Sequence, residues 1–120
     1  MAEDRALDAE VAEKVLDQRV VWHEGCPYFD DVPPGVARFP VREVPEYSRS
    51  IYEAWWIAED LGLLVTPTLT GGWGAGQFQG TTGHPDGGRR YCVPGTWAEA
   101  EDAPEAICRA ALLVMAQKPD

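Results

Sequence analysis

The sequence has no long hydrophobic run and begins with an acidic segment. No stretch reaches the roughly 18 to 20 consecutive apolar residues that a membrane-spanning helix needs. A secretory signal starts with basic residues followed by an apolar core, whereas this chain starts MAEDRALDAE. We therefore expect a soluble protein that stays in the cytoplasm and does not bind a membrane.

Basic residues are scarce. Lys and Arg number 10 against 20 Asp and Glu, giving a net charge of −10. Because affinity for nucleic acids comes mainly from neutralising phosphates, a long nucleic acid is excluded as the expected partner. The acids are unevenly spread, since Asp86 is the only Asp or Glu between Leu61 and Ala98, a stretch that also holds Arg89 and Arg90. This middle segment is therefore compatible with a small anion.

Cysteine and histidine are too few and too irregularly spaced for a disulfide framework or a zinc knuckle. The three cysteines, Cys26, Cys92 and Cys108, are an odd number without CxxC spacing, which indicates reduced thiols. His23 and His84, taken with Cys26 and Cys92, lack the matched spacing of a structural zinc site. Both histidines also lie in Pro- or Gly-rich loops, so no nucleophile and base are expected to meet. We predict a non-enzymatic protein with no catalytic residues, no metal and no cofactor.

Three amphipathic helices are predicted, within a single domain of residues 1–120. The first covers about residues 5–18, with an apolar stripe of Leu7, Val11 and Val15 and acids at positions 8, 10, 13 and 17 on the opposite face. The last covers residues 102–118 and is expected to organise the fold. Its predicted start is an acidic capping box of Asp102 and Glu105. Its predicted buried stripe is Ile107, Ala110, Ala111 and Val114.

The middle helix is expected to begin after Ser48 or Ser50, of which Ser50 forms a capping-box pattern with Glu53, and to end at Gly62. Its expected buried stripe is Ile51, Ala54, Trp55, Ala58 and Leu61. Trp56 lies beside this stripe and is interpreted either as a residue at the core edge or as a contact with another subunit. We assign it as the interface residue.

Strands are predicted at Leu63–Thr70, Trp73–Gln79 and about residues 90–93, whereas the proline-rich residues 24–45 are expected to form a long loop. Glycines occupy alternate positions around the second strand, so one of its faces is nearly bare backbone. That face suits either close packing or a flat ligand. Short connections require antiparallel pairing. We predict an α+β fold, an antiparallel three- to four-stranded sheet packed by helices as an α-β-α sandwich.

Three segments in order carry a resemblance to a known family: LDAEVAEKV, VPEYS at the start of a helix with a central tryptophan, and DAPEAICRAALL. Together they resemble the phage ABA sandwich domain family, small phage and prophage proteins with a helix–sheet–helix sandwich. The resemblance implies this fold and a phage-encoded accessory protein in the cytoplasm of a bacterial host.

A weaker likeness is to phage anti-Thoeris proteins, which sequester cyclic nucleotide signals as symmetric oligomers by stacking the base on an aromatic ring and holding phosphates with arginines. This likeness implies a homo-oligomer and ligand-binding roles for Trp73 or Phe78 and for Arg89, Arg90 and Arg109. Arg109 has an alternative interpretation, an exposed ion pair with Glu105. The function expected is sequestration of a small cyclic nucleotide or a nucleotide-like anion, an anti-defence role. The alternative is a structural or protein–protein interaction module with no small ligand.

Overall fold

In the described part of the chain, two strands follow the first helix and three follow the second, before the last helix, in an α+β arrangement. The computed structural model describes residues 2–30, 42–78 and 92–117. Within them lie three helices, α1 (Ala2–Lys14), α2 (Ile51–Leu61) and α3 (Ala103–Gln117). The same residues form five strands, β1 (Val20–His23), β2 (Cys26–Phe29), β3 (Leu63–Pro67), β4 (Trp73–Gln77) and β5 (Ala98–Ala100). Every strand pair within these described residues is antiparallel, so the α+β class and the antiparallel pairing predicted from the sequence are confirmed.

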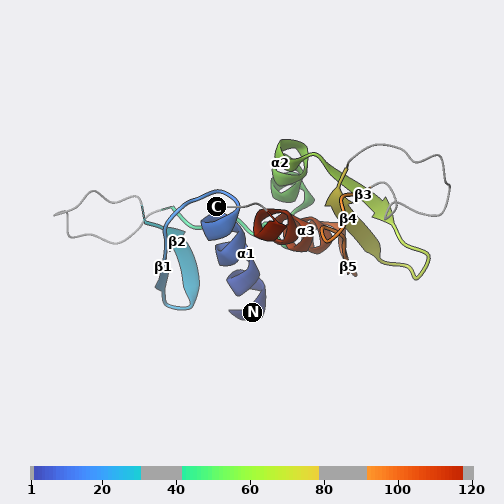
Figure 1. Cartoon of the computed structure of the whole chain (residues 1–120). Coiled ribbons are helices and arrows are strands. Elements are labelled where there is room, and N and C mark those ends of the chain that lie inside the picture. Colours follow the sequence, from blue (N-terminus) through green and yellow to red (C-terminus); the bar gives the residue numbers. More distant parts are fainter. Residues whose placement is uncertain (1, 31–41, 79–91, 118–120) are drawn as a thin grey trace.

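Helix α3 is the centre of the molecule. It packs on the sheet of β3, β4 and β5 through one side and on α1 and α2 through the others. The β1–β2 hairpin lies against the far side of α1, so the helices are between the two small sheets (Figure 1). The predicted stripe of α3 is buried, and Ala106 and Cys108 are buried beside it. Small side chains on several faces allow α3 to contact the sheet and both other helices closely.

The side-chain capping of α3 differs from the prediction. The Asp102 carbonyl accepts the Ala106 N–H at 3.1 Å, so the helix begins where expected. The Glu105 carboxylate, however, accepts from Arg109 Nε at 2.9 Å instead of reaching back to the cap. An oppositely charged side chain one turn away offers it a charge-assisted hydrogen bond. The acidic capping box is therefore not formed.

Helix α2 begins and ends as predicted, but only part of its predicted stripe, Ala54, Ala58 and the partly buried Leu61, packs in the core. Ser50 Oγ accepts the Glu53 N–H at 3.3 Å, and Gly62 ends the helix with φ 66°. The buried residues are Ala54, Ile57 and Ala58, which belong to the same core cluster as the buried residues of α3. Ile51 and Trp55, predicted as core, are about half exposed. The helix is thus rotated relative to the predicted stripe.

The three-stranded sheet has the order β3-β4-β5. Its first hairpin was predicted, and Val65 is paired with Ala75 at the middle of it. The third strand is Ala98–Ala100, which lies outside the strands predicted from the sequence. Of the strand predicted at about residues 90–93, Cys92 makes a single bridge with Phe78, and residues 90 and 91 lie outside the described residues.

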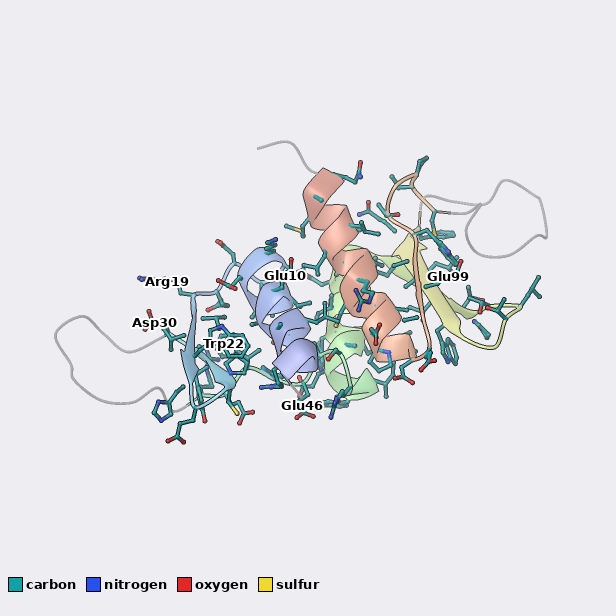
Figure 2. The ribbon with its side chains drawn as sticks, turned by 90° about the horizontal axis from the view of Figure 1, so that it is seen from below. Glu10, Arg19, Trp22, Asp30, Glu46 and Glu99 are labelled. Atoms are coloured by element: carbon teal, nitrogen blue, oxygen red, sulfur yellow. The ribbon has the colours of Figure 1, made fainter. Side chains whose placement is uncertain are left out.

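The pairing of β1 with β2 was not predicted, although the β-prone run Val20-Val21-Trp22 is interpreted from the sequence either as a strand or as the exit of the first helix. The turn of this hairpin is Glu24-Gly25, both with positive φ, and Trp22 is paired with Pro27. Pro27 has no backbone N–H and therefore leaves no donor unpaired in the strand. Its carbonyl accepts the Val44 N–H at 3.0 Å. Figure 2 shows Arg19 and Asp30 close together at the open end of this hairpin, where their charged groups are 3.7 Å apart. The predicted long loop is therefore a hairpin in its first part.

One predicted solvent-facing acid of α1 is buried. Asp8 is fully buried and its Oδ2 lies 2.7 Å from Arg5 Nη1. Its Oδ1 accepts the backbone N–H of Ser48 at 2.7 Å, and Arg5 also donates to the Val44 carbonyl. A buried charge is tolerated when it is paired and hydrogen-bonded in this way. This network fixes α1 to the segment that leads into α2.

Candidate functional site

Four of the exposed large apolar side chains among the described residues lie on α2. Tyr52 is 71% exposed, Trp56 62%, Ile51 50% and Trp55 49%. Spacings of three and four residues make these four side chains neighbours on the helix surface. We call them the aromatic face of α2. Isolated exposed apolar residues are ordinary, whereas a contiguous apolar patch is typical of a binding surface.

This face exists because α2 is apolar around most of its circumference. Of its residues IYEAWWIAEDL, only Glu53, Glu59 and Asp60 are charged. Packing on α3 covers Ala54, Ile57 and Ala58 and leaves the bulky aromatic side chains outside. Sequence reasoning assigned Trp56 to an interface, which stays a prediction, and did not single out Tyr52 and Trp55 as exposed. The sequence signal that could have found them is that α2 contains more apolar residues than a single buried stripe accommodates.

A groove runs beside the aromatic face, between α2 and the C-terminal end of α1. Its volume is about 290 Å³, and the residues that line it are Val15, Leu16, Tyr47, Glu53, Trp56, Ile57 and Asp60. The floor is apolar, because Tyr47 and Ile57 are both buried. Cavities that bind drug-sized ligands begin at about 300 Å³, so this groove suits a single side chain or a small group.

The groove is negatively charged. Glu53 and Asp60 lie one turn before and one turn after Trp56, and neither carboxylate forms an ion pair with any residue that the structure describes. Burial, followed by the nearby Glu53 carboxylate, raises the pKa of Tyr47 from 10.0 to about 12. The nearby Arg42 guanidinium opposes this rise in the Tyr47 pKa. The charged side chains that line the groove itself are the two carboxylates of Glu53 and Asp60.

The ligand-binding residues predicted from the sequence are not all brought together. Trp73 and Phe78 are five positions apart along one strand and its continuation, so they lie on opposite faces of the sheet. Arg109 is exposed on α3 and forms the ion pair with Glu105, which was its alternative interpretation. Arg89 and Arg90 lie outside the described residues.

The glycine face of β4 is already occupied. A Cβ on Gly74 would collide with the ring of Trp97, and one on Gly76 would lie 2.9 Å from Cys92 Sγ. The Trp97 indole N–H donates to Glu99 at 2.9 Å, which fixes the ring over the strand. Of the two interpretations of this face, close packing is the one that the structure contains, and the packing partner is a side chain of the same chain.

Trp73 contributes to a different groove, at the N-terminal end of α3. This groove has a volume of about 680 Å³, and Ser48, Arg49, Ile51, Asp102, Ala103, Pro104 and Glu105 line it together with Trp73. Trp73 is 36% exposed there and offers a ring for stacking. Arg49 supplies a positive charge, but Asp102 and Glu105 bring two negative ones. The groove is thus mixed in charge.

Among residues 2–30, 42–78 and 92–117, no group of His, Cys, Asp and Glu is arranged to hold a metal ion. No helix in the same ranges is long and apolar enough to cross a membrane. Comparisons of the chain with protein-family models, with curated proteins and with solved structures found no match. The resemblance to the phage ABA sandwich domain family therefore stays a prediction.

Proposed function

We propose that this protein is a non-enzymatic protein-binding module that recognises its partner through the aromatic face of α2. The observation that carries the proposal is the exposure of Tyr52, Trp55 and Trp56 side by side on a helix whose other side packs in the core. Tryptophan and tyrosine are the residues most enriched at the energetic centres of protein interfaces. Their burial by a partner would remove a large apolar area from water.

Photo-crosslinking tests this function. The photoreactive residue benzoylphenylalanine is placed at position 52, or at position 69 as a control, because Leu69 is also fully exposed but lies in the β3–β4 turn. In an extract of the natural source cells, position 52 is expected to give an adduct of defined mass and position 69 none. An excess of unlabelled protein should suppress the adduct, whereas an excess of the Trp55→Gln/Trp56→Gln variant should not.

Equal adducts at both positions, or none at position 52, would overturn the proposal. An adduct of twice the chain mass would identify the partner as a second copy, which is the homo-oligomer predicted from the sequence. Light scattering on the purified protein measures directly whether it is a monomer or an oligomer.

Sequestration of a small cyclic nucleotide is a second candidate, supported by the position of Trp73 in the groove that also contains Arg49. Thermal shifts with cyclic dinucleotides, cyclic trinucleotides and cyclic ADP-ribose isomers test it. Stabilisation by one of these ligands, abolished by Trp73→Ala and by Arg49→Gln, is expected if the groove binds it. Absence of a shift with every ligand would contradict this function. The phage origin stays a prediction under either function.

A further inference from the structure

The groove between α1 and α2 borders the aromatic face of α2. The groove is negatively charged, whereas the aromatic face is apolar. Trp56 belongs to both, since it is part of the aromatic face and lines the groove. Glu53 and Asp60 are spaced three residues before and four residues after Trp56, so all three side chains project from one side of α2. A planar indole is thereby flanked by two carboxylates over an apolar floor.

A guanidinium matches each part of this arrangement. It is attracted to the face of an indole, which is the best of the aromatic side chains for a cation. Its donors form a planar fork that suits carboxylate oxygens, and it is less strongly hydrated than an ammonium. The aliphatic stem of an arginine can lie along Val15, Leu16 and Ile57, because arginine buries its methylenes and keeps its charged end near water.

We infer that the groove lined by Glu53, Trp56 and Asp60 receives an arginine side chain of a basic partner protein that docks on the aromatic face of α2. This inference rests on the proposed function and names the chemistry of the partner. It commits to a basic partner because the chain itself carries a net charge of −10. In a symmetric pair of copies joined through this face, each acidic groove would approach its own counterpart, which is repulsive.

Two amphipathic helical peptides provide the test, one built of Leu, Ala and Arg and the other with citrulline in place of every arginine. Citrulline has nearly the same shape but no charge. Calorimetry at low salt is expected to show about tenfold tighter binding of the arginine peptide, the size that a cation–π contact with flanking carboxylates allows. The indole N–H resonance of Trp56, assigned with Trp56→Phe, is expected to shift on binding.

The variant Glu53→Gln/Asp60→Asn should abolish the difference between the peptides. Its matched control is Glu24→Gln/Glu101→Gln, which removes the same charge at exposed positions outside the groove and should leave the difference unchanged. Circular dichroism and urea unfolding of all variants verify that they are folded. Loss of the difference in both double variants would mean that net charge alone attracts the peptide, and would overturn the inference.

Failure of the inference is distinguishable from failure of the proposed function. Equal affinity for both peptides, or no binding of either, overturns the arginine site. If crosslinking at position 52 nevertheless captures a partner, the docking function of α2 stands without it. If the crosslinking fails and the arginine peptide still binds at Trp56, the groove is a cation site and the wider aromatic face is not a docking surface.

Discussion

The Asp8 carboxylate accepts the backbone N–H of Ser48 at 2.7 Å although the two residues are 40 positions apart in the sequence. The other carboxylate oxygen lies 2.7 Å from Arg5 Nη1, and Arg5 Nη2 is 3.0 Å from the Glu43 carboxylate. Helix α1 is thereby tied to the chain segment that enters α2. Since Tyr47 and α2 both line the acidic groove, this tie also positions the candidate site.

Replacing Asp8 is expected to destabilise the protein strongly. Asp8→Ala leaves the Arg5 guanidinium without its buried partner, and the free energy of unfolding should fall by about 3 to 5 kcal/mol. Asp8→Asn should cost less, because its amide oxygen can still accept the Ser48 N–H. Urea denaturation measures both changes. The control is Glu13→Ala, an exposed acid of the same helix, which should change stability by less than about 0.5 kcal/mol. Equal effects of Asp8→Ala and Glu13→Ala would contradict the buried network.

The contact between Gly74 and Trp97 predicts an effect of overpacking. Gly74→Ala would place a methyl group against the indole ring, and should lower the free energy of unfolding by about 1 to 3 kcal/mol. A double-mutant cycle with Trp97→Ala isolates the contact. In the Trp97→Ala background, where the ring is absent, Gly74→Ala should lower the free energy of unfolding much less. An unchanged cost in the Trp97→Ala background would show that the ring is not what fills this face.

The orientation of α2 predicts opposite outcomes for two of its bulky residues. Ile57 is 3% exposed, so Ile57→Ala should lower the free energy of unfolding by about 2 to 5 kcal/mol. Trp55→Ala should cost about 1 kcal/mol or less, because half of its side chain is exposed and its hydrogen bond to Glu59 is at the surface. Chemical denaturation of the two variants decides the orientation. A larger loss for Trp55→Ala would favour the stripe predicted from the sequence.

Stability is expected to fall at alkaline pH. The pKa of Tyr47 is raised from 10.0 to about 12 by burial and by Glu53, and burial also raises that of Cys108 above its ordinary value of 9.0. The unfolded chain loses these two protons at lower pH than the folded chain. The contribution of Tyr47 and Cys108 to the free energy of unfolding is therefore complete below pH 9 and is lost as pH rises.

Tyr47→Phe isolates the tyrosine in this pH dependence. Urea denaturation across a pH series should show a smaller stability loss between pH 10 and 12 for this variant than for the original protein. Tyr52→Phe is the control, since that ring is 71% exposed. The prediction is contradicted if the two variants and the original protein share the same alkaline slope.

The sequence determined the features that depend on neighbours along the chain. Ser50 and Gly62 fix the ends of α2 through local hydrogen bonding and a left-handed backbone, and both were predicted. The small and apolar residues of α3 predicted a buried central helix. The alternation of β4 predicted which of its residues share a face. Each of these signals lies within a few residues, so no knowledge of the rest of the fold was needed.

The tertiary structure decided what lies opposite each surface. The pattern of α2 contains more apolar positions than one stripe, and only its packing on α3 selects Ile57 as buried and Trp55 as exposed. The bare face of β4 is open to several occupants in the sequence, and Trp97 fills it from 23 positions downstream of Gly74. Asp8 appears as one of several acids on a helix until Ser48 and Arg5 are placed beside it. The acidic groove has the same origin, because α1, Tyr47 and α2 form it only when distant segments meet.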